Sequence, residues 1–461
     1  MDPAAAPDRP RDGTFAVLRH SAFRWIWLGA MVSNIGNWME AVGQSWLVQQ
    51  QTASPFLVEC LAASEFVPVV LLSLYAGALA DRYDRRKLLL AGQIAMMVLA
   101  AVLAQVTHLG YATPWVIITL AFLEGAAWAA VTPAWQALVP TLVPRDELPS
   151  AIALNSAQFN TARLIGPSLA GALLTAAGAA FVFELNVLSF AAIVVALALV
   201  RVPAAPLAKA ATTSTELKKQ GGLLEGVRWA LAKRGPRRLL LGLLVFALCT
   251  APVQGLMPTM ADAVLRVGAH GYGVLLSCLG GGAIFGALTL ARLPRHYPRH
   301  HLIPLSMLGY SLCAMVYAGS SHLLVAGAAL SVGGVFWVWS LASSSTAMQL
   351  LVADESRGRA MSVLSLATMG PLPLGHLIGG VLAHNLGVRA AILCTTGTLA
   401  LFSLWSVWSR EPLIDQLEPQ KHSGPRTLRN ALWEALTAAS HRAQEVEPGQ
   451  AKGSAEPLDE P

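Results

Sequence analysis

Charged side chains are scarce in this sequence. Asp, Glu, Lys and Arg make up only 13% of its 461 residues, whereas 55% of the residues are hydrophobic. A soluble protein carries roughly 25% charged residues, so this composition argues against an ordinary soluble fold. Several apolar runs reach about 18 residues, which is long enough to span a lipid bilayer. We therefore expect a membrane protein.

Motifs for several kinds of chemistry are also missing. The sequence has no GxxxxGK[ST] loop for ATP binding, no zinc-ligand cluster and no nucleophile elbow. Its five cysteines lie inside apolar runs without CxxC spacing, and we interpret them as packing residues. We therefore expect no enzyme and no bound cofactor or metal. Any work done by this chain would draw on an ion gradient or on the gradient of its own substrate.

Basic residues outnumber acidic ones, which gives a formal net charge of +6. Such an excess could indicate nucleic-acid binding, but here the basic residues sit in short loops between apolar runs. Most of these loops fall on one predicted side, and only Arg266 and Arg389 lie near the other side. Because basic loops stay in the cytoplasm, we expect both termini there, in a bacterial inner membrane, and no nucleic-acid partner.

Twelve apolar segments are expected to be membrane-spanning helices. They cover residues 24–49, 57–80, 87–107, 114–138, 150–177, 180–200, 238–263, 271–292, 302–320, 323–349, 359–385 and 388–408. The predicted organisation is an N-terminal segment (1–23), a first six-helix bundle (24–200), a basic linker (201–236), a second bundle (237–409) and a polar tail (410–461). The fold class is thus an all-α membrane protein.

The two predicted bundles repeat each other at a constant offset of 209 residues. The matching positions are Gly77 and Gly286, Val143 and Val352, Ala151 and Ala360, Gly166 and Gly375, and Gly171 and Gly380. A constant offset over several landmarks indicates two homologous halves with pseudo-symmetry. Parallel repeats of several membrane helices, with a cavity at their interface, are typical of transporters.

The loop after the second span contains a cluster of ionisable residues. Gly77 permits close helix contact, Asp81 can accept hydrogen bonds, and three arginines can pair across helices: Arg82, Arg85 and Arg86. Such a cluster can latch the two halves together in one state; a plain cytoplasmic basic loop is the alternative. The string Gly77–Lys87 resembles the signature loop of the major facilitator superfamily, which implies a gating role for Asp81. Asp84 departs from that signature, and the second copy lacks the acid, so a latch would be asymmetric.

The fifth span contains Gly166, Pro167 and Gly171. Glycine and proline inside a membrane helix allow close packing and a local bend, which is useful for alternating access; ordinary packing of small residues is the alternative. The string resembles the antiporter motif of superfamily exporters, although Ala170 replaces one glycine. That resemblance favours export.

Further strings resemble one branch, the enterobactin-exporter-like or transmembrane secretion effector group. They are Gly36–Trp38, Ala80–Arg86, Pro133–Pro140, Ala153–Ser156, Phe159–Arg163 and Leu185–Phe190. The resemblance covers roughly residues 15–410. It implies a twelve-helix exporter of siderophores, macrolides or other amphiphilic small molecules.

Ionisable residues inside the predicted spans need a reason, because a buried charge costs several kcal/mol unless it is paired or hydrated. Glu40 lies with Asn37 and Gln44 on one helix face, which should line the central cavity. Burial of a carboxyl group favours its protonated form, so Glu40 or Glu124 could load and release protons, with Arg163 as counter-charge. A static ion pair or a water-lined contact is the alternative. The superfamily's usual Arg before the Glu124 position is absent, which puts its standard proton relay in doubt.

Other residues of the spans are candidates for the cavity lining or for packing. Trp38 and Trp337, with Asn155 and Phe159, are expected to line a cavity for an amphiphilic ligand; interfacial anchoring is the alternative for tryptophans. His376, aligned with Pro167, is interpreted as a hydrogen-bonded packing residue. Together these features predict a monomeric, proton-linked exporter of a small molecule in the lipid bilayer. An importer, a lipid flippase of the same fold, or a non-transporting scaffold or sensor remain alternatives.

Overall fold

The computed structural model describes residues 14–200, 227–228, 230–293, 299–352 and 357–408. Most of the predicted linker and the whole predicted tail lie outside these ranges, so the predicted domain boundaries there remain predictions. The described helices up to Val407 form one compact unit. All five cysteines are free thiols, in keeping with their interpretation as packing residues.

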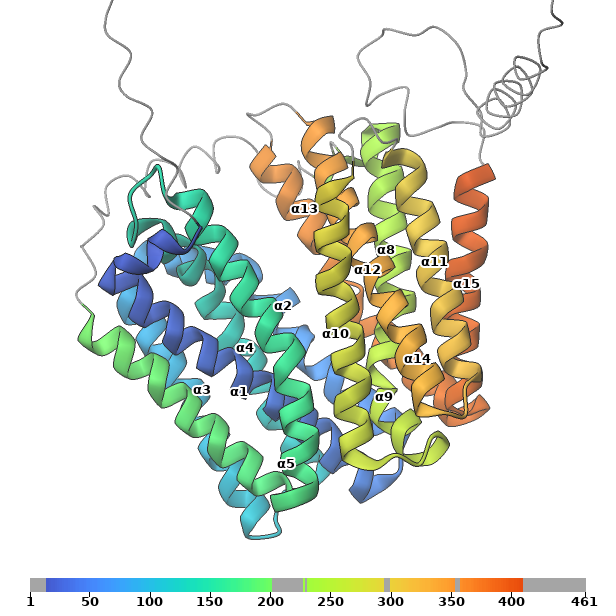
Figure 1. Cartoon of the computed structure of the whole chain (residues 1–461), viewed down its shortest axis with the longest axis horizontal. Helices are drawn as coiled ribbons and strands as arrows, with labels where there is room; N and C mark the ends of the chain where they lie inside the picture. The colour runs from blue at the N-terminus through green and yellow to red at the C-terminus, as the bar shows by residue number, and fades with distance from the viewer. Residues whose placement is uncertain (1–13, 201–226, 229, 294–298, 353–356, 409–461) are drawn as a thin grey trace, which may run out of the picture. The chain divides into compact units, whose positions relative to one another are not determined.

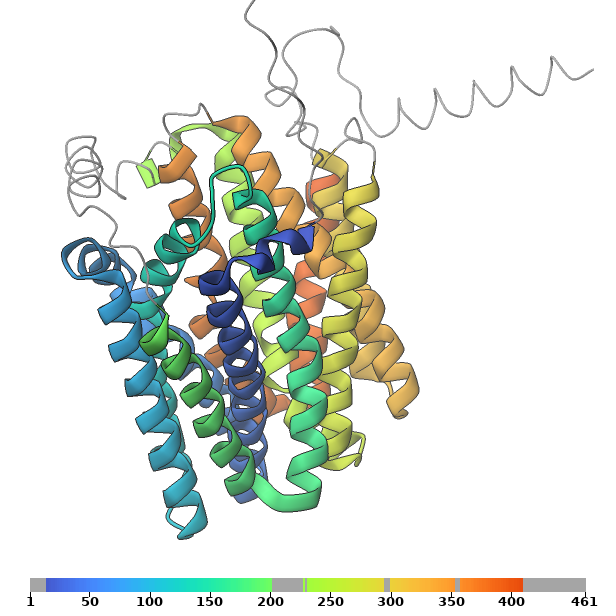
Figure 2. The ribbon, with the colours of Figure 1, turned by 60° about the vertical axis from the view of Figure 1, so that its left-hand side comes forward.

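The first half of the chain supplies six membrane-length helical passes. They are α1 (Ser21–Thr52), α2 (Pro55–Arg82), α3 (Arg85–His108), α4 (Pro114–Leu138) and the two parts of α5 (Leu148–Leu199). The backbone of α5 leaves helical geometry at Gly178, where φ is 82° and ψ is 177°. Glycine tolerates this conformation, and α5 reverses direction there, as Figure 2 shows.

The second half repeats this pattern with two interrupted spans. It contains α8 (Arg234–Gly255), α9 (Met257–Thr259), a π-helical turn (Met260–Val264), α10 (Gly268–Arg292), α11 (Arg299–Gly319), α12 (Leu323–Leu351), α13 (Arg357–Met369), α14 (Leu372–Leu386) and α15 (Val388–Trp408). The α8–α9 segment and the α13–α14 segment each make one pass. Figure 1 shows the helices of each half gathered together.

Ten segments of the described chain are long and apolar enough to cross a membrane. One of them is the 52-residue α5, which makes two passes because it reverses at Gly178. Helix α1 is not among the ten but has 32 residues, which is enough to span a bilayer. The predicted all-α membrane fold with twelve passes is therefore confirmed.

Glycines at seven-residue intervals fix the packing of α1 against the second part of α5. A Cβ atom on Gly36 would lie 2.1 Å from Ser189 Oγ, and one on Gly43 would lie 2.7 Å from a ring carbon of Phe183. Gly29 makes the same kind of close approach one heptad earlier. Lipid tails are as apolar as the helices, so close packing by small residues is a main source of helix association in membranes.

The 209-residue repeat extends to helix packing. Gly125 of α4 faces α2, where an added Cβ would lie 2.4 Å from the carbonyl oxygen of Glu65. Gly334 of α12 stands 209 residues later and faces α10, where its Cβ would lie 2.3 Å from the carbonyl oxygen of Leu279. Equivalent glycines thus join equivalent helices in the two halves.

We call the side at which α5 ends and α8 begins the linker side, and the opposite side the far side. The halves meet along α5 and α10, and along α2 and α14. Ser168 Oγ of α5 donates to Ser277 Oγ of α10 at 2.6 Å. Towards the far side, Gln49 of α1 donates to Asp262 Oδ2 at 3.0 Å and accepts from Thr259 Oγ1 at 2.7 Å.

Candidate transport site

A buried polar cluster in the first half contains both acids that the sequence singled out. Glu40 of α1 is 3% exposed and accepts hydrogen bonds from Gln44 Nε2, at 3.0 Å, and from Asn186 Nδ2 of α5. The Gln44 amide also donates to Glu124 Oε2 of α4 at 3.2 Å. One side-chain amide therefore bridges the two carboxyl groups.

The second carboxyl group of this cluster is incompletely satisfied. Glu124 Oε1 is buried and has no hydrogen-bond partner among the described residues. Glu40 and Glu124 lie within hydrogen-bonding reach of each other, and Glu65 of α2 is close enough for its charge to act on both. A carboxylic acid can donate a hydrogen bond, whereas a carboxylate can only accept, so this pair is suited to hold a proton.

Arg163 lies between tryptophans from the two halves. Its guanidinium carbon is 4.3 Å from the ring centroid of Trp337 in α12 and 5.6 Å from that of Trp38 in α1. Phe159, one turn earlier in α5, meets Trp38 edge-on with ring centroids 6.4 Å apart. Cation–π contacts of this kind are worth about 0.5–2 kcal/mol. Two predicted aromatic residues, one from each half, therefore contact the same cationic group.

The predicted ion pair between Arg163 and the acids is not formed in this structure. Within the described part of the chain, neither Glu40 nor Glu124 makes an ion pair with Arg163, because the acids bond to Gln44 and Asn186 instead. Gln44 is 2% exposed and belongs to the acid cluster. Of the other predicted cavity residues, Phe159 is exposed and four are half-buried: Asn37, Trp38, Asn155 and Trp337.

The glycine–proline motif of α5 lies at close contacts between helices. A Cβ atom on Gly166 would be 2.6 Å from Trp38 Cβ in α1, and one on Gly171 would be 2.7 Å from the Ala269 carbonyl oxygen in α10. The carbonyl oxygen of Pro167 would be 2.3 Å from a Cβ atom on Gly273. The motif therefore packs at the interface of the two halves, but the non-helical backbone of α5 is at Gly178 and not at Pro167.

The arginines of the predicted gating loop bind the ends of neighbouring helices. Arg86 donates to the carbonyl oxygens of Leu197 and Ala198 at 2.8 Å and 2.7 Å, close to the end of α5. Arg85 donates to the Ala137 carbonyl oxygen near the end of α4 at 3.4 Å. Cations are favourable at helix C-termini, so both arginines stabilise the first half.

The remaining residues of this loop are only partly described. Asp84, where the sequence departs from the superfamily signature, is the N-cap of α3 and accepts from the Lys87 backbone N–H at 2.9 Å. Gly77, Asp81 and Arg82 belong to α2, but the side chains of Asp81 and Arg82 lie outside the described part of the structure. The latch therefore stays a prediction.

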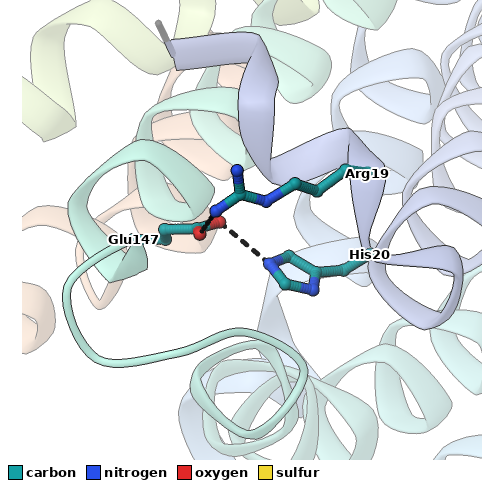
Figure 3. A network of polar contacts seen from close by, with 3 residues as sticks. All are labelled: Arg19, His20 and Glu147. Carbon is teal, nitrogen blue, oxygen red and sulfur yellow. Dashed lines mark hydrogen bonds and ion pairs between the residues drawn. The ribbon is translucent and has the colours of Figure 1, made fainter. Parts of the chain in front are cut away.

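Two polar contacts were not anticipated from the sequence. His376 of α14 is hydrogen-bonded, as expected, but its partner is Glu59 of α2 in the other half, with Nδ1 2.5 Å from Oε2. The second contact lies on the linker side, where Glu147 binds both Arg19 and His20 (Figure 3). It ties the start of α1 to the loop before α5. The only sequence signal for Glu59 was an acid inside an apolar run.

Residues 12–435 match the family described as transmembrane secretion effectors. The chain belongs to this family of the major facilitator superfamily. Similar proteins include the staphyloferrin A transporter of Staphylococcus aureus, which is 26% identical over 77% of this chain and 87% of that protein. The macrolide efflux protein A of Streptococcus pyogenes is 21% identical over 82% of this chain and 93% of that protein. The multidrug efflux pump Tap of Mycobacterium tuberculosis is 24% identical over 85% of this chain and 94% of that protein.

Several solved structures of transporters share the fold of this chain. A bacterial homologue of the human lysosomal transporter Spinster, in an inward-facing and unoccupied conformation, has a TM-score of 0.68 and 16% sequence identity. The match covers 87% of this chain and 99% of that structure. A D-xylose–proton symporter has a TM-score of 0.62 and 12% sequence identity, and the match covers 89% of this chain and 100% of that structure. Its family and its relatives show that the chain is a multi-pass membrane transporter of small molecules and not an enzyme.

Proposed function

We propose that this transporter exports a small amphiphilic molecule, of siderophore or drug-like size, across the bacterial inner membrane in exchange for protons. The observation that carries the proposal is the buried Glu40–Gln44–Glu124 cluster close to the centre of the fold. Efflux proteins among the relatives support the direction of transport. A monomer with both termini in the cytoplasm suffices for this function.

The acid cluster supplies a place for protons. Two carboxyl groups this close to one another repel if both are ionised, and burial makes each charge more expensive. One of them therefore holds a proton while the cluster stays buried. Exposure to water would release that proton, and alternating access would expose the cluster to the two sides of the membrane in turn.

The aromatic residues around Arg163 supply a place for the exported molecule. Trp38 comes from the first half and Trp337 from the second, so a ligand that binds against both rings contacts both halves. Aromatic rings and a cation suit an amphiphilic ligand with a flat or acidic part. The contacts of such a ligand change when the halves move relative to one another, as alternating access requires.

The proposal is tested by accumulation in inverted membrane vesicles, in which the far side faces the lumen. Acidification of the lumen should drive uptake of at least one of three probes: staphyloferrin A, the macrolide erythromycin or the dye ethidium. A protonophore should abolish this uptake. Uptake should lose its dependence on the proton gradient in Glu40→Gln or Glu124→Gln, whereas Glu184→Gln, an exposed acid on α5, should behave like the wild type.

The other outcomes identify the alternatives. Transport of a probe only in the opposite direction would indicate an importer, and transfer of a fluorescent phospholipid between leaflets would indicate a flippase. Retention of proton-driven uphill transport in both Gln variants would reject the assigned coupling residues. No movement of any probe or lipid would favour a scaffold or sensor.

A further inference from the structure

A buried carboxyl–imidazole contact joins the two halves of the transporter. Glu59 of α2 has no exposed surface, and His376 of α14 is 5% exposed. Besides the hydrogen bond between them, the His376 ring stacks on Phe66 of α2, with ring centroids 6.1 Å apart and planes 10° apart. Glu59 lies in the second turn of α2, near the far side. The contact therefore closes the interface of the halves on that side.

Glycines of the second half form the slot that receives the Glu59 side chain. A Cβ atom on Gly255 would lie 2.2 Å from Glu59 Oε2 and 2.7 Å from His376 Nδ1. Cβ atoms on Gly379 and Gly380 would lie 3.2 Å from Glu59 Oε1 and 3.0 Å from Glu59 Cβ. Three positions that would block the acid thus carry no side chain, so the second half is shaped to admit it.

The number of protons in this contact depends on whether it is buried. A neutral imidazole beside an ionised Glu59 would leave one net negative charge away from water, which is costly. One additional proton, shared between Nδ1 and Oε2, makes the closed pair neutral. If the halves separate, both groups meet water, where histidine releases its proton near pH 6.5 and glutamic acid near pH 4.3. Above pH 6.5, separation of the halves therefore releases one proton, and closure takes one up.

Two other ionisable groups of the described chain act on the pair. The charge of Glu65, on the same helix, acts on His376, and the Cys60 thiol lies next to Glu59. A negative charge on Glu65 stabilises a protonated His376 and so favours the extra proton. Glu65 also acts on Glu40, so ionisable groups extend from the far-side contact to the acid cluster.

We propose that Glu59 and His376 form a second proton-binding site, at the interface of the halves, whose occupation by a proton closes the transporter on the far side. Protons that arrive from the far side would favour this closure and so return the transporter to the state that loads substrate from the linker side. This inference rests on the proposed proton-linked export and assigns it a proton-controlled closure distinct from Glu40 and Glu124.

Far-side closure can be measured between spin labels at Tyr111 and Leu324, which are 70% and 86% exposed and belong to different halves. The labels are placed in the full chain with its native cysteines replaced. In the wild-type background, the ratio of closed to separated molecules should rise by up to about tenfold for each unit of falling pH above pH 6.5, because one proton is taken up, and should level off below pH 6.5. His376→Gln should keep this dependence and extend it below pH 6.5, towards about pH 4.3, because the buried Glu59 carboxyl group must then take up the proton alone. In Glu59→Gln, acidification should no longer favour closure, because only the separated histidine can then gain a proton.

Thr259→Val is the matched control, since it removes an uncharged hydrogen bond between the halves near the same side. This variant should shift the closed fraction equally at every pH and keep the wild-type pH dependence. A wild-type distance that does not respond to pH, or a Glu59→Gln variant in which acidification still favours closure, would overturn the proposal. Such a result would leave proton-driven uptake in vesicles intact, whereas failure of uptake in the wild type would reject the export function itself.

Discussion

The guanidinium group of Arg163 rests on the ring of Trp337, 4.3 Å from its centroid, so a cation of the first half contacts an aromatic ring of the second. The acids Glu40 and Glu124 are held apart from this arginine by their own hydrogen bonds to Gln44 and Asn186. The structure thus separates a group suited to ligands from a group suited to protons.

Loss of the Trp337 ring should weaken ligand binding. Trp337→Leu removes a ring on which a flat cationic probe such as ethidium can stack, and a cation–π contact of this kind is worth about 1 kcal/mol, so the affinity for ethidium should fall roughly fivefold. Binding to the purified transporter checks this. Trp339→Phe is the control, because Trp339 donates to the Gly286 carbonyl oxygen at 2.8 Å within the second half. An equal loss of affinity in the control would contradict a specific role for Trp337.

An added methyl group at Gly36 should destabilise the first half. Its Cβ would collide with Ser189 and Asn186, and overpacking of this kind costs about 1–3 kcal/mol. Gly36→Ala should therefore lower the midpoint of thermal unfolding in detergent. Gly319→Ala, where an added Cβ meets nothing within 4 Å, should leave the midpoint nearly unchanged. Equal midpoints for both variants would show that the α1–α5 packing is looser than described.

Arg86 should matter for stability more than for gating. Arg86→Gln removes two hydrogen bonds from a cation to the end of α5, which should cost about 1–2 kcal/mol of unfolding free energy. Thermal unfolding measures this loss, with the exposed Lys87→Gln as control. If Arg86→Gln unfolds like the wild type but transports poorly, a gating role is the better account.

The predicted latch depends on Asp81. Asp81→Asn should alter the transport rate and the distribution of conformations, because the latch needs a negative charge. Asp84→Asn is a matched control three residues later, since asparagine is also a good N-cap and should preserve the start of α3. Labelled-distance measurements together with vesicle uptake check both variants. An Asp81→Asn transporter with unchanged transport and conformations would refute the latch.

The sequence predicted the helices well because apolar runs of membrane length leave the backbone little alternative. The repeat offset also predicted which glycines are equivalent, and the pair Gly171 and Gly380 illustrates this, since each packs across the interface of the halves. Long-range partners could not be predicted. Glu59 and His376 are 317 positions apart, and no local pattern connects them. Asp84 departed from a family signature, and only the structure shows its capping bond.

Proton movement caused by substrate is the most direct test of proton-linked export. Purified transporter is reconstituted into liposomes that contain a pH-sensitive dye, and staphyloferrin A, erythromycin or ethidium is added to the linker side without any imposed gradient. The account predicts that a transported probe moves protons in the opposite direction, and that the combined Glu40→Gln and Glu124→Gln variant moves none. Transport of a probe with no accompanying proton movement in the wild type would contradict it.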